Sequence, residues 1–434
     1  MTSNKDIKFK LVISYVFLLL GALLEIGALQ IIGCIMIFFF IANASIEKAL
    51  LYIMAMVPNC AIFTISSIGS NFLGFSFLII LFKIIIGRNG WRLYIPPYTI
   101  IVSVYLLFIS IMRVTSSNFY DFALVCQIII VVIAWNSIIR RISYFSAIGL
   151  IDIFRFGCIL MTLGMIFQYP FEKNGIGRFH AVLDDCNYTG GVCCILLCMG
   201  LIIYCYKLPI KNNYKYITLA IMSGLMTGSR GFLLSSAVGF FVLLITHSFG
   251  KQTFKFVLSV LMLFAISYSL YLLNFGPAIT VFDNTIGRTM TLEEAHSDGQ
   301  FMDVTSGRTI LWGYYMALTL KDMSIFYFGK GFYNYFKEEN GGFGLAAHNM
   351  YVSSIVGVGI IGTILILLLY FSIIKNHIKG IHRKYIVSFG SIVAAIMVCY
   401  FFLDGILETR FVSYFAIMIL LIKIWSYNES RIDI

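Results

Sequence analysis

Long runs of apolar residues alternate with short polar segments along almost the whole chain. The runs show no two-residue alternation, which argues against an outer-membrane barrel. A membrane-spanning helix needs about 20 mostly apolar residues, with about 17 as a lower limit. The predicted runs cover residues 11–24, 27–44, 49–66, 71–87, 96–114, 120–138, 144–168, 186–206, 214–227, 230–248, 253–274, 346–374, 384–402 and 407–425. Because several runs are marginal in length, the pattern predicts an all-α, polytopic integral membrane helical bundle of about 12–14 transmembrane helices, with residues 1–434 as a single membrane domain.

One large polar segment, residues 275–345, interrupts this pattern. Within it, the stretch from Gly307 to Asp322 carries apolar side chains at helical spacing. They are Ile310, Leu311, Tyr314, Tyr315 and Leu318. We expect a short amphipathic helix on the outer membrane surface, with its aromatic side chains toward the lipid.

Composition agrees with the membrane interpretation. Apolar residues make up 60% of the chain and charged residues 12%, with a mean hydropathy of +0.92; a soluble domain carries about 25% charged residues. In a soluble protein the net charge of +11 would suggest nucleic acid. Here the charge is explained by basic loops, so no nucleic-acid partner is predicted.

The basic residues indicate the orientation. They gather in loops that the order of the spans places on one side: Lys5, Lys8, Lys10, Lys83, Arg88, Arg92, Arg140, Arg141, Lys207, Lys211, Lys215, Lys251, Lys255, Lys375, Lys379, Arg383 and Lys384. The positive-inside rule makes that side cytoplasmic. Segments 169–185, 275–345 and 403–410 then face outward, and they carry most of the acidic residues.

Five arginines are nevertheless predicted to face outward: Arg178, Arg230, Arg288, Arg308 and Arg410. The planar guanidinium group binds phosphate through two hydrogen bonds. Arg230 lies in the motif Thr227-Gly228-Ser229-Arg230-Gly231, a tight turn between two apolar runs, where a charge is costly without a partner or ligand. The alternatives are an Arg230 that extends to lipid headgroups or pairs with a loop carboxylate, and an Arg308 that is only a solvated residue at a helix start.

Among the histidines, His348 is the best candidate for acid–base chemistry. It lies where the polar segment meets an apolar run, and a near-neutral imidazole there can reach a sugar hydroxyl and a lipid-borne phosphate. The alternative is a structural interfacial histidine. His180 follows a glycine-containing candidate turn. No H-E-x-x-H, C-x-x-C or nucleotide-binding motif occurs, so the sequence predicts neither a metal nor a cofactor.

Several of these motifs together resemble the bacterial O-antigen polymerase and O-antigen ligase family. The similarity is strongest from about residue 215 to 375. The motifs, in chain order, are Arg178-Phe179-His180 with Asp185-Cys186-Asn187, then Thr227-Gly228-Ser229-Arg230-Gly231, Gly307-Arg308 with Leu311-Trp312, Gly329-Lys330-Gly331-Phe332 and His348-Asn349-Met350-Tyr351.

The resemblance implies a metal-independent, inverting glycosyltransferase of lipopolysaccharide biosynthesis, in the bacterial inner membrane with a periplasmic active site. Arg230 and Arg308 would hold the diphosphate of an undecaprenyl-diphosphate-linked oligosaccharide donor, and His348 would be the general base. The further expected substrate-binding residues are Arg178, Arg288, His180, Asn349 and Tyr351.

The expected partners are the lipid-linked donor and acceptor, membrane lipid and a chain-length regulator. A polymerase would transfer the growing glycan to a lipid-linked repeat unit, and we favour this activity. A ligase that transfers it to lipid A-core is the first alternative. A flippase for lipid-linked oligosaccharides is the second, and it would be expected to show paired broken helices in both halves of the chain.

Overall fold

The computed structural model describes residues 3–63, 72–87, 90–112, 119–168, 186–246, 308–331, 347–378, 381, 383–400 and 409–432. The regular elements in these ranges are all helical. Five of the helices are long and apolar enough to cross a membrane, and shorter apolar helices accompany them. The chain is therefore an all-α, multi-pass membrane protein, as its sequence predicts. It divides into two compact units, each described below by itself.

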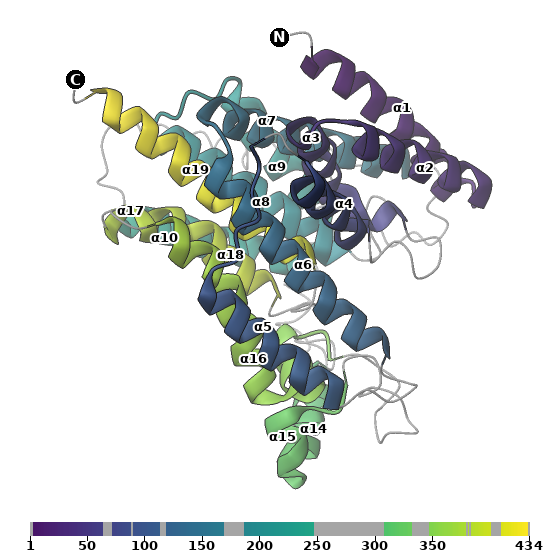
Figure 1. The fold of residues 1–434 in the computed structure, drawn as a ribbon, viewed down its shortest axis with the longest axis vertical. Helices are drawn as coiled ribbons and strands as arrows, with labels where there is room; N and C mark the ends of the chain where they lie inside the picture. The colour runs from purple at the N-terminus through teal and green to yellow at the C-terminus, as the bar shows by residue number, and fades with distance from the viewer. Residues whose placement is uncertain are drawn as a thin grey trace, which may run out of the picture. The chain divides into compact units, whose positions relative to one another are not determined.

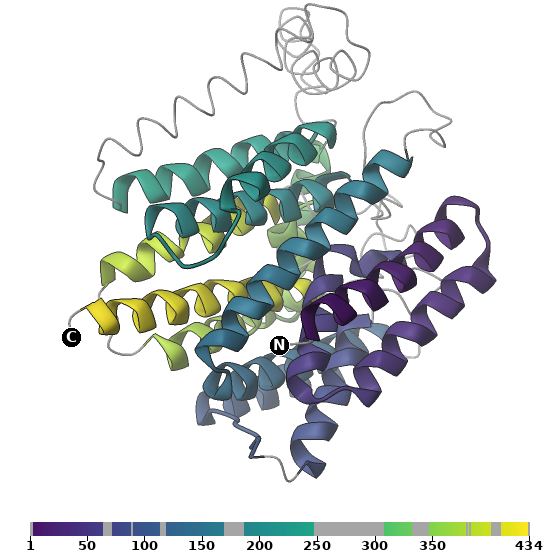
Figure 2. The same ribbon diagram turned by 90° about the horizontal axis from the view of Figure 1, so that it is seen from above.

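Unit 1 contains residues 1–160, 308–381 and 400–434. Its helices are α1 (Ser3–Leu23), α2 (Gly27–Asn43), α3 (Ile46–Met56), α4 (Phe72–Ile86), α5 (Pro97–Met112), α6 (Phe119–Arg141), most of α7 (Tyr144–Gln168), α14 (Arg308–Lys321), α15 (Met323–Phe328), α16 (Met350–His377) and α19 (Thr409–Ile432). The predicted run 144–168 and α7 have the same bounds. Helices α1 and α2 lie side by side in both views (Figures 1 and 2).

The centre of unit 1 is built from α6, α16 and α19. Tyr370 of α16 packs its ring against two rings of α19, at centroid distances of 5.2 Å from Phe411 and 5.8 Å from Phe415. The buried Trp135 of α6 donates its Nε1–H to Ser413 Oγ over 3.4 Å. Aromatic packing therefore joins α16 to α19, and a hydrogen bond joins α19 to α6.

One predicted span in unit 1 is wrong. Residues 49–66 do not form one helix, because α3 ends at Met56 and a 3-10 helix, Val57–Phe63, follows. Pro58 explains the change, since proline lacks the N–H that an α-helix needs and its ring clashes with the preceding turn. Asn59 then uses its side-chain amide to donate to the carbonyl of Gly157 over 2.8 Å.

Helix α7 contains an ion pair. The Nη1 atom of Arg155 lies 3.2 Å from Asp152 Oδ1, one helical turn away. Arg155 is fully buried. A buried charge needs such a partner, and Asp152 supplies one for Arg155 within the same helix.

Unit 2 contains residues 161–307 and 382–399. Its helices are α8 (Cys186–Cys205), α9 (Asn213–Met226), α10 (Arg230–Thr246), α17 (Arg383–Phe389) and α18 (Ser391–Cys399). Helix α10 packs against both α8 and α18. A Cβ on Gly239 of α10 would lie 2.5 Å from Cys198 Sγ of α8, so the small residue sets how closely these helices approach.

The polar segment 275–345 holds two short helices in its described part. Helix α14 matches the predicted amphipathic stretch, and α15 follows it; both lie beside the N-terminal end of α16 (Figure 1). The predicted run 253–274 lies outside the described residues.

The expected orientation of the α14 side chains is wrong. Tyr315 of α14 is fully buried in a cluster with Ala347, Val352 and Val356, against which the neighbouring aromatic residues of α14 also pack. Amphipathic spacing reports an apolar face without identifying what covers it. Here protein from α16 covers that face in place of lipid.

Candidate functional site

The predicted site residues fall in both units, and each part is described separately. In unit 2, Arg230 is the first residue of α10, and it follows a buried turn at the end of α9. Thr227 Oγ1 donates to the carbonyl of Gly224 over 2.6 Å and accepts from the backbone N–H of Ser229 over 3.2 Å. Gly228 has φ +57°, the left-handed conformation that glycine adopts without steric cost. The hydroxyl group of Thr227 and the left-handed conformation of Gly228 therefore close the turn before Arg230.

A second helix fixes the same turn. Ser229 Oγ donates to Asn187 Oδ1 of α8 over 2.8 Å and accepts from the backbone N–H of Phe232 over 3.3 Å. Ser229 is thus the N-cap of α10. A Cβ on Gly190 of α8 would lie 3.0 Å from Ser229 Cβ, so this glycine permits the close approach. Arg230 itself is half-buried at a helix N-terminus, where the helix dipole favours an anion.

In unit 1, His348 occupies the turn that precedes α16. It is half-buried and has φ +49°, which non-glycine residues seldom adopt. On one side, Ala347 accepts a hydrogen bond of 2.7 Å at its carbonyl from the indole Nε1–H of Trp312 in α14. On the other side, Asn349 Oδ1 accepts from the backbone N–H groups of Tyr351 and Val352 over 2.9 and 3.2 Å. His348 is therefore held between two anchored neighbours.

Helix α16 is broken near the same end. Gly359 has φ +73° and ψ +173°, so the helix is interrupted within its span. The carbonyls of Val356 and Gly357, which precede the break, accept hydrogen bonds of 2.7 and 2.8 Å from the backbone N–H groups of Lys330 and Gly331. Main-chain groups at membrane depth must be satisfied by protein, and the Gly329-Lys330-Gly331 motif supplies the donors.

Two glycines make this joint possible. A Cβ on Gly359 would lie 2.2 Å from the carbonyl oxygen of Tyr327, and a Cβ on Gly329 would lie 2.2 Å from that of Gly357. Both residues have positive φ. The backbones of α15 and α16 are therefore in direct contact at this joint.

The predicted site residues are placed as follows. His348, Asn349 and Tyr351 are consecutive in the α16 entry, and Arg308 begins α14 in the same unit. Arg230 begins α10 in unit 2. Arg178, His180 and Arg288 lie outside the described residues. The convergence of Arg230, Arg308 and His348 on one substrate stays a prediction.

Sequence reasoning missed two supporting contacts. The Trp312–Ala347 hydrogen bond joins residues 35 positions apart, and the Ser229–Asn187 bond joins residues 42 apart. All four residues lie in or beside the motifs noted above, but neither periodicity nor local spacing indicates such pairs. Asn349 was expected to bind substrate; its side chain caps α16, and substrate binding stays a prediction.

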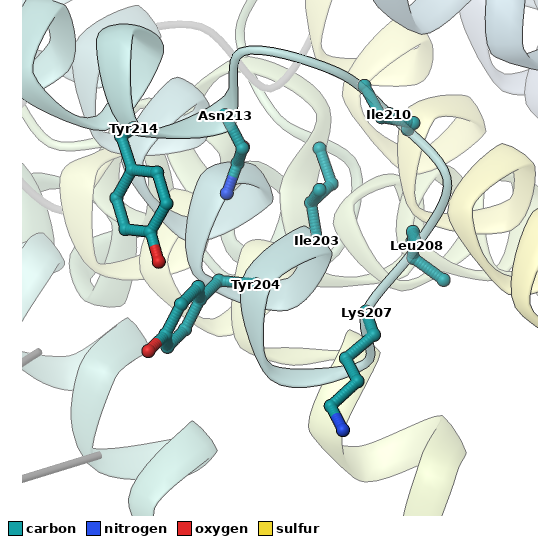
Figure 3. Close-up of a pocket in the computed structure, with 7 residues that line it drawn as sticks. All are labelled: Ile203, Tyr204, Lys207, Leu208, Ile210, Asn213 and Tyr214. Carbon is teal, nitrogen blue, oxygen red and sulfur yellow. The ribbon is translucent and has the colours of Figure 1, made fainter. Parts of the chain in front are cut away.

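A pocket of 410 Å³ lies in unit 2, at the connection between α8 and α9 (Figure 3). Ile203, Tyr204, Lys207, Leu208, Ile210, Asn213 and Tyr214 line it. None of these is a predicted site residue, so the pocket gives no support to the expected chemistry.

The comparisons with known proteins bear on the motifs directly. Residues 216–367 match the family model of the O-antigen ligases. The resemblance to the O-antigen polymerase and ligase family is confirmed. The matched segment includes Arg230, Arg308 and His348, together with α14, α15 and the break in α16. Family members are glycosyltransferase-like enzymes, and both polymerases and ligases are among them. No curated protein and no solved structure matches the chain.

Proposed function

We propose that the protein is a surface-polysaccharide polymerase, which transfers a growing glycan from undecaprenyl diphosphate to a lipid-linked repeat unit. The observation that carries the proposal is the family match over residues 216–367, because that one segment contains Arg230, Arg308 and His348. The reaction would be a metal-independent glycosyl transfer with inversion at the anomeric carbon. Its driving force would come from the diphosphate leaving group.

The roles of the residues follow from their chemistry. Arg230 and Arg308 would neutralise the charge that builds on the diphosphate as the sugar leaves, which is electrostatic stabilisation of the transition state. His348 would take the proton of the acceptor hydroxyl as it attacks. The anchored turn around His348 favours this role, because a general base must be held within hydrogen-bonding reach of its substrate. Arg178, Arg288, His180, Asn349 and Tyr351 are proposed to bind the two lipid-linked glycans.

The proposed location is the periplasmic face of the inner membrane. Helix α16 begins beside His348 and ends at His377, near the basic residues Arg140 and Lys423. The segment Met350–Lys375 is long and apolar enough to cross a membrane. His348 and the basic end of the unit would then lie on opposite sides. With the basic side in the cytoplasm, His348 faces the periplasm.

The experiment changes His348 and Arg230 separately to Ala. We expect the rate of transfer to fall about 10²- to 10⁴-fold without the general base and about 10²- to 10³-fold without Arg230. Purified protein reconstituted with a defined lipid-linked repeat unit gives the rate, and surface glycan on gels gives the chain lengths. Lys321→Ala is the matched control, since it removes an exposed cation from the same family segment. A glycan ladder that survives both changes would end the catalytic assignment.

The same gels separate the alternatives. Loss of long chains with single-repeat lipopolysaccharide retained indicates a polymerase, and loss of every capped form indicates a ligase. The ligase alternative gains support from the name of the matched family. The flippase alternative gains some support from the break at Gly359, because broken helices are typical of transporters. Movement of a labelled lipid-linked sugar across vesicles, unaffected by His348→Ala, would favour it.

A further inference from the structure

Cationic side chains from three spanning helices gather at the end of unit 1 opposite His348. The cations are Arg140 of α6, Lys375 of α16 and Lys423 of α19, and we refer to them as the cationic cluster. His377 of α16 lies beside Arg140 and Lys423. Lys423 Nζ donates to the carbonyl of Ile139, which places it beside Arg140. Arg140 and Lys375 lie in the last turns of α6 and α16, and Lys423 lies within α19, so three different helices contribute a charge to this region.

Aromatic rings flank this cluster. The guanidinium of Arg140 lies 4.3 Å from the ring centroid of Tyr94, and Lys375 Nζ lies 4.9 Å from that of Tyr98. A hydrogen bond of 3.1 Å between Thr99 Oγ1 and Ser372 Oγ holds the start of α5 against the end of α16. These cation–π contacts orient the two exposed cations and leave their charges in place.

Like charges in such proximity repel one another. Burial lowers the pKa of His377 to about 4, and the charges of Lys423 and Arg140 act in the same direction. His377 is therefore neutral near pH 7, and its buried Nε2 has no hydrogen-bond partner among the described residues. Among the described residues, the ion pairs Lys10–Asp6 and Arg155–Asp152 involve none of the cations of the cluster.

We propose that the cationic cluster binds the phosphate group of an anionic phospholipid. Guanidinium and ammonium groups bind phosphate through charge-assisted hydrogen bonds. Arg140 and Lys375 lie where the spanning helices α6 and α16 end, which is the depth of lipid headgroups. Basic pockets between such helices bind anionic lipids. Tyr94 and Tyr98 are residues of the type that accumulates at this interface. The site does not depend on the proposed glycosyl transfer, because it lies at the other end of α16 from His348.

A simpler explanation is that these are ordinary basic residues of cytoplasmic loops. General attraction of an anionic surface would depend on the number of charges and not on where they lie. A specific site would depend on these particular residues. Removing two cations of the cluster, and separately two cations elsewhere, therefore distinguishes the explanations, because both changes remove the same total charge.

The experiment measures binding of phosphatidylglycerol and phosphatidylcholine to the purified full-length protein by native mass spectrometry. The test variant is Arg140→Gln with Lys375→Gln, and the matched control is Lys211→Gln with Lys215→Gln, two exposed lysines of unit 2. We expect the unchanged protein to prefer phosphatidylglycerol about 25-fold, since each surface cation contributes about fivefold. The test variant should bind both lipids about equally, and the control should keep the preference to within about twofold.

A charge-conserving variant, Arg140→Lys with Lys375→Arg, guards against misfolding and should retain most of the preference. Equal losses in test and control variants would overturn the site in favour of general surface charge. An unchanged preference in a folded test variant would overturn it as well. Glycerol 3-phosphate, added as a soluble competitor, should displace the lipid only weakly. Displacement at the affinity of the lipid itself would contradict a lipid site and indicate a soluble phosphate ligand.

Discussion

The turns before α10 and α16 each present a candidate catalytic residue at a helix entry, but different groups hold them in place. The Arg230 turn is fixed mainly by side chains, through the bond of Ser229 to Asn187 on another helix. The His348 turn is fixed by side chains that bind main-chain groups, because Trp312 donates to the carbonyl of Ala347. Asn349 Oδ1 accepts from two backbone N–H groups at the start of α16. A side-chain network is sensitive to loss of a single polar atom. Where two backbones pack directly, as α15 and α16 do at Gly359, stability is most sensitive to an added Cβ that would force the backbones apart.

The largest loss of stability is expected from a substitution at the break in α16. Gly359→Ala would place a Cβ 2.2 Å from the carbonyl oxygen of Tyr327 on a residue with φ +73°. Left-handed strain and the overlap together should lower the free energy of unfolding by more than about 3 kcal/mol. Thermal unfolding of the purified protein in detergent measures the change.

Gly313→Ala is the control for this prediction. Gly313 lies in α14, and an added Cβ there would meet nothing within 4 Å. Replacing a helical glycine with alanine should stabilise the protein slightly, by about 0.5–1 kcal/mol. Equal stability of the two variants would contradict a tight joint between α15 and α16.

The second largest loss of stability is expected in unit 2, where Ser229 bonds to Asn187. Asn187→Ala removes the acceptor of Ser229 at a buried site, and we expect a loss of stability of about 2 kcal/mol. Ser229→Ala also removes the N-cap of α10. A double-mutant cycle should give a coupling energy of about 0.5–3 kcal/mol. Additive losses would mean that the two side chains do not act as a unit.

The helices themselves were largely predictable from the sequence. Continuous apolar runs identify helices that lipid or protein must cover, so α7 has the predicted bounds. The exceptions have local causes that a hydropathy pattern does not include. Pro58 ends α3 early, and Gly359 breaks α16 inside an apolar run in which no proline and no Lys, Arg, Asp or Glu indicates a break.

The motifs predicted which helix starts carry Arg230 and His348. They did not predict the contacts that hold these two turns in place. The entry of α16 at His348 and the start of α10 at Arg230 both agree with the sequence. The contacts that support them join positions far apart in the chain. The orientation of α14 was wrong for a related reason, because the apolar partner of Tyr315 comes from α16 and its position depends on tertiary packing.

The third prediction separates two roles for Asn349. Asn349→Ala removes the acceptor for the N–H groups of Tyr351 and Val352, which should cost about 1 kcal/mol of stability. Asn349→Ser keeps a capping oxygen and should restore most of it. If transfer activity stays low in a stable Asn349→Ser protein, Asn349 also contacts substrate. Full activity in that variant would limit Asn349 to capping.

The smallest loss of stability is expected at Trp312, whose indole donates a hydrogen bond to the turn that contains His348. Trp312→Phe keeps an aromatic ring against the Tyr315 cluster but removes the N–H that donates to Ala347 over 2.7 Å. The loss of stability should be about 1 kcal/mol. If this bond positions His348, the turnover rate should fall more than stability alone explains, with little change in KM. Thr319→Val is the comparison on the same helix, because it removes hydrogen bonds to α14 carbonyls and none to the His348 turn. Equal activity in the two variants would show that the turn holds His348 without the indole.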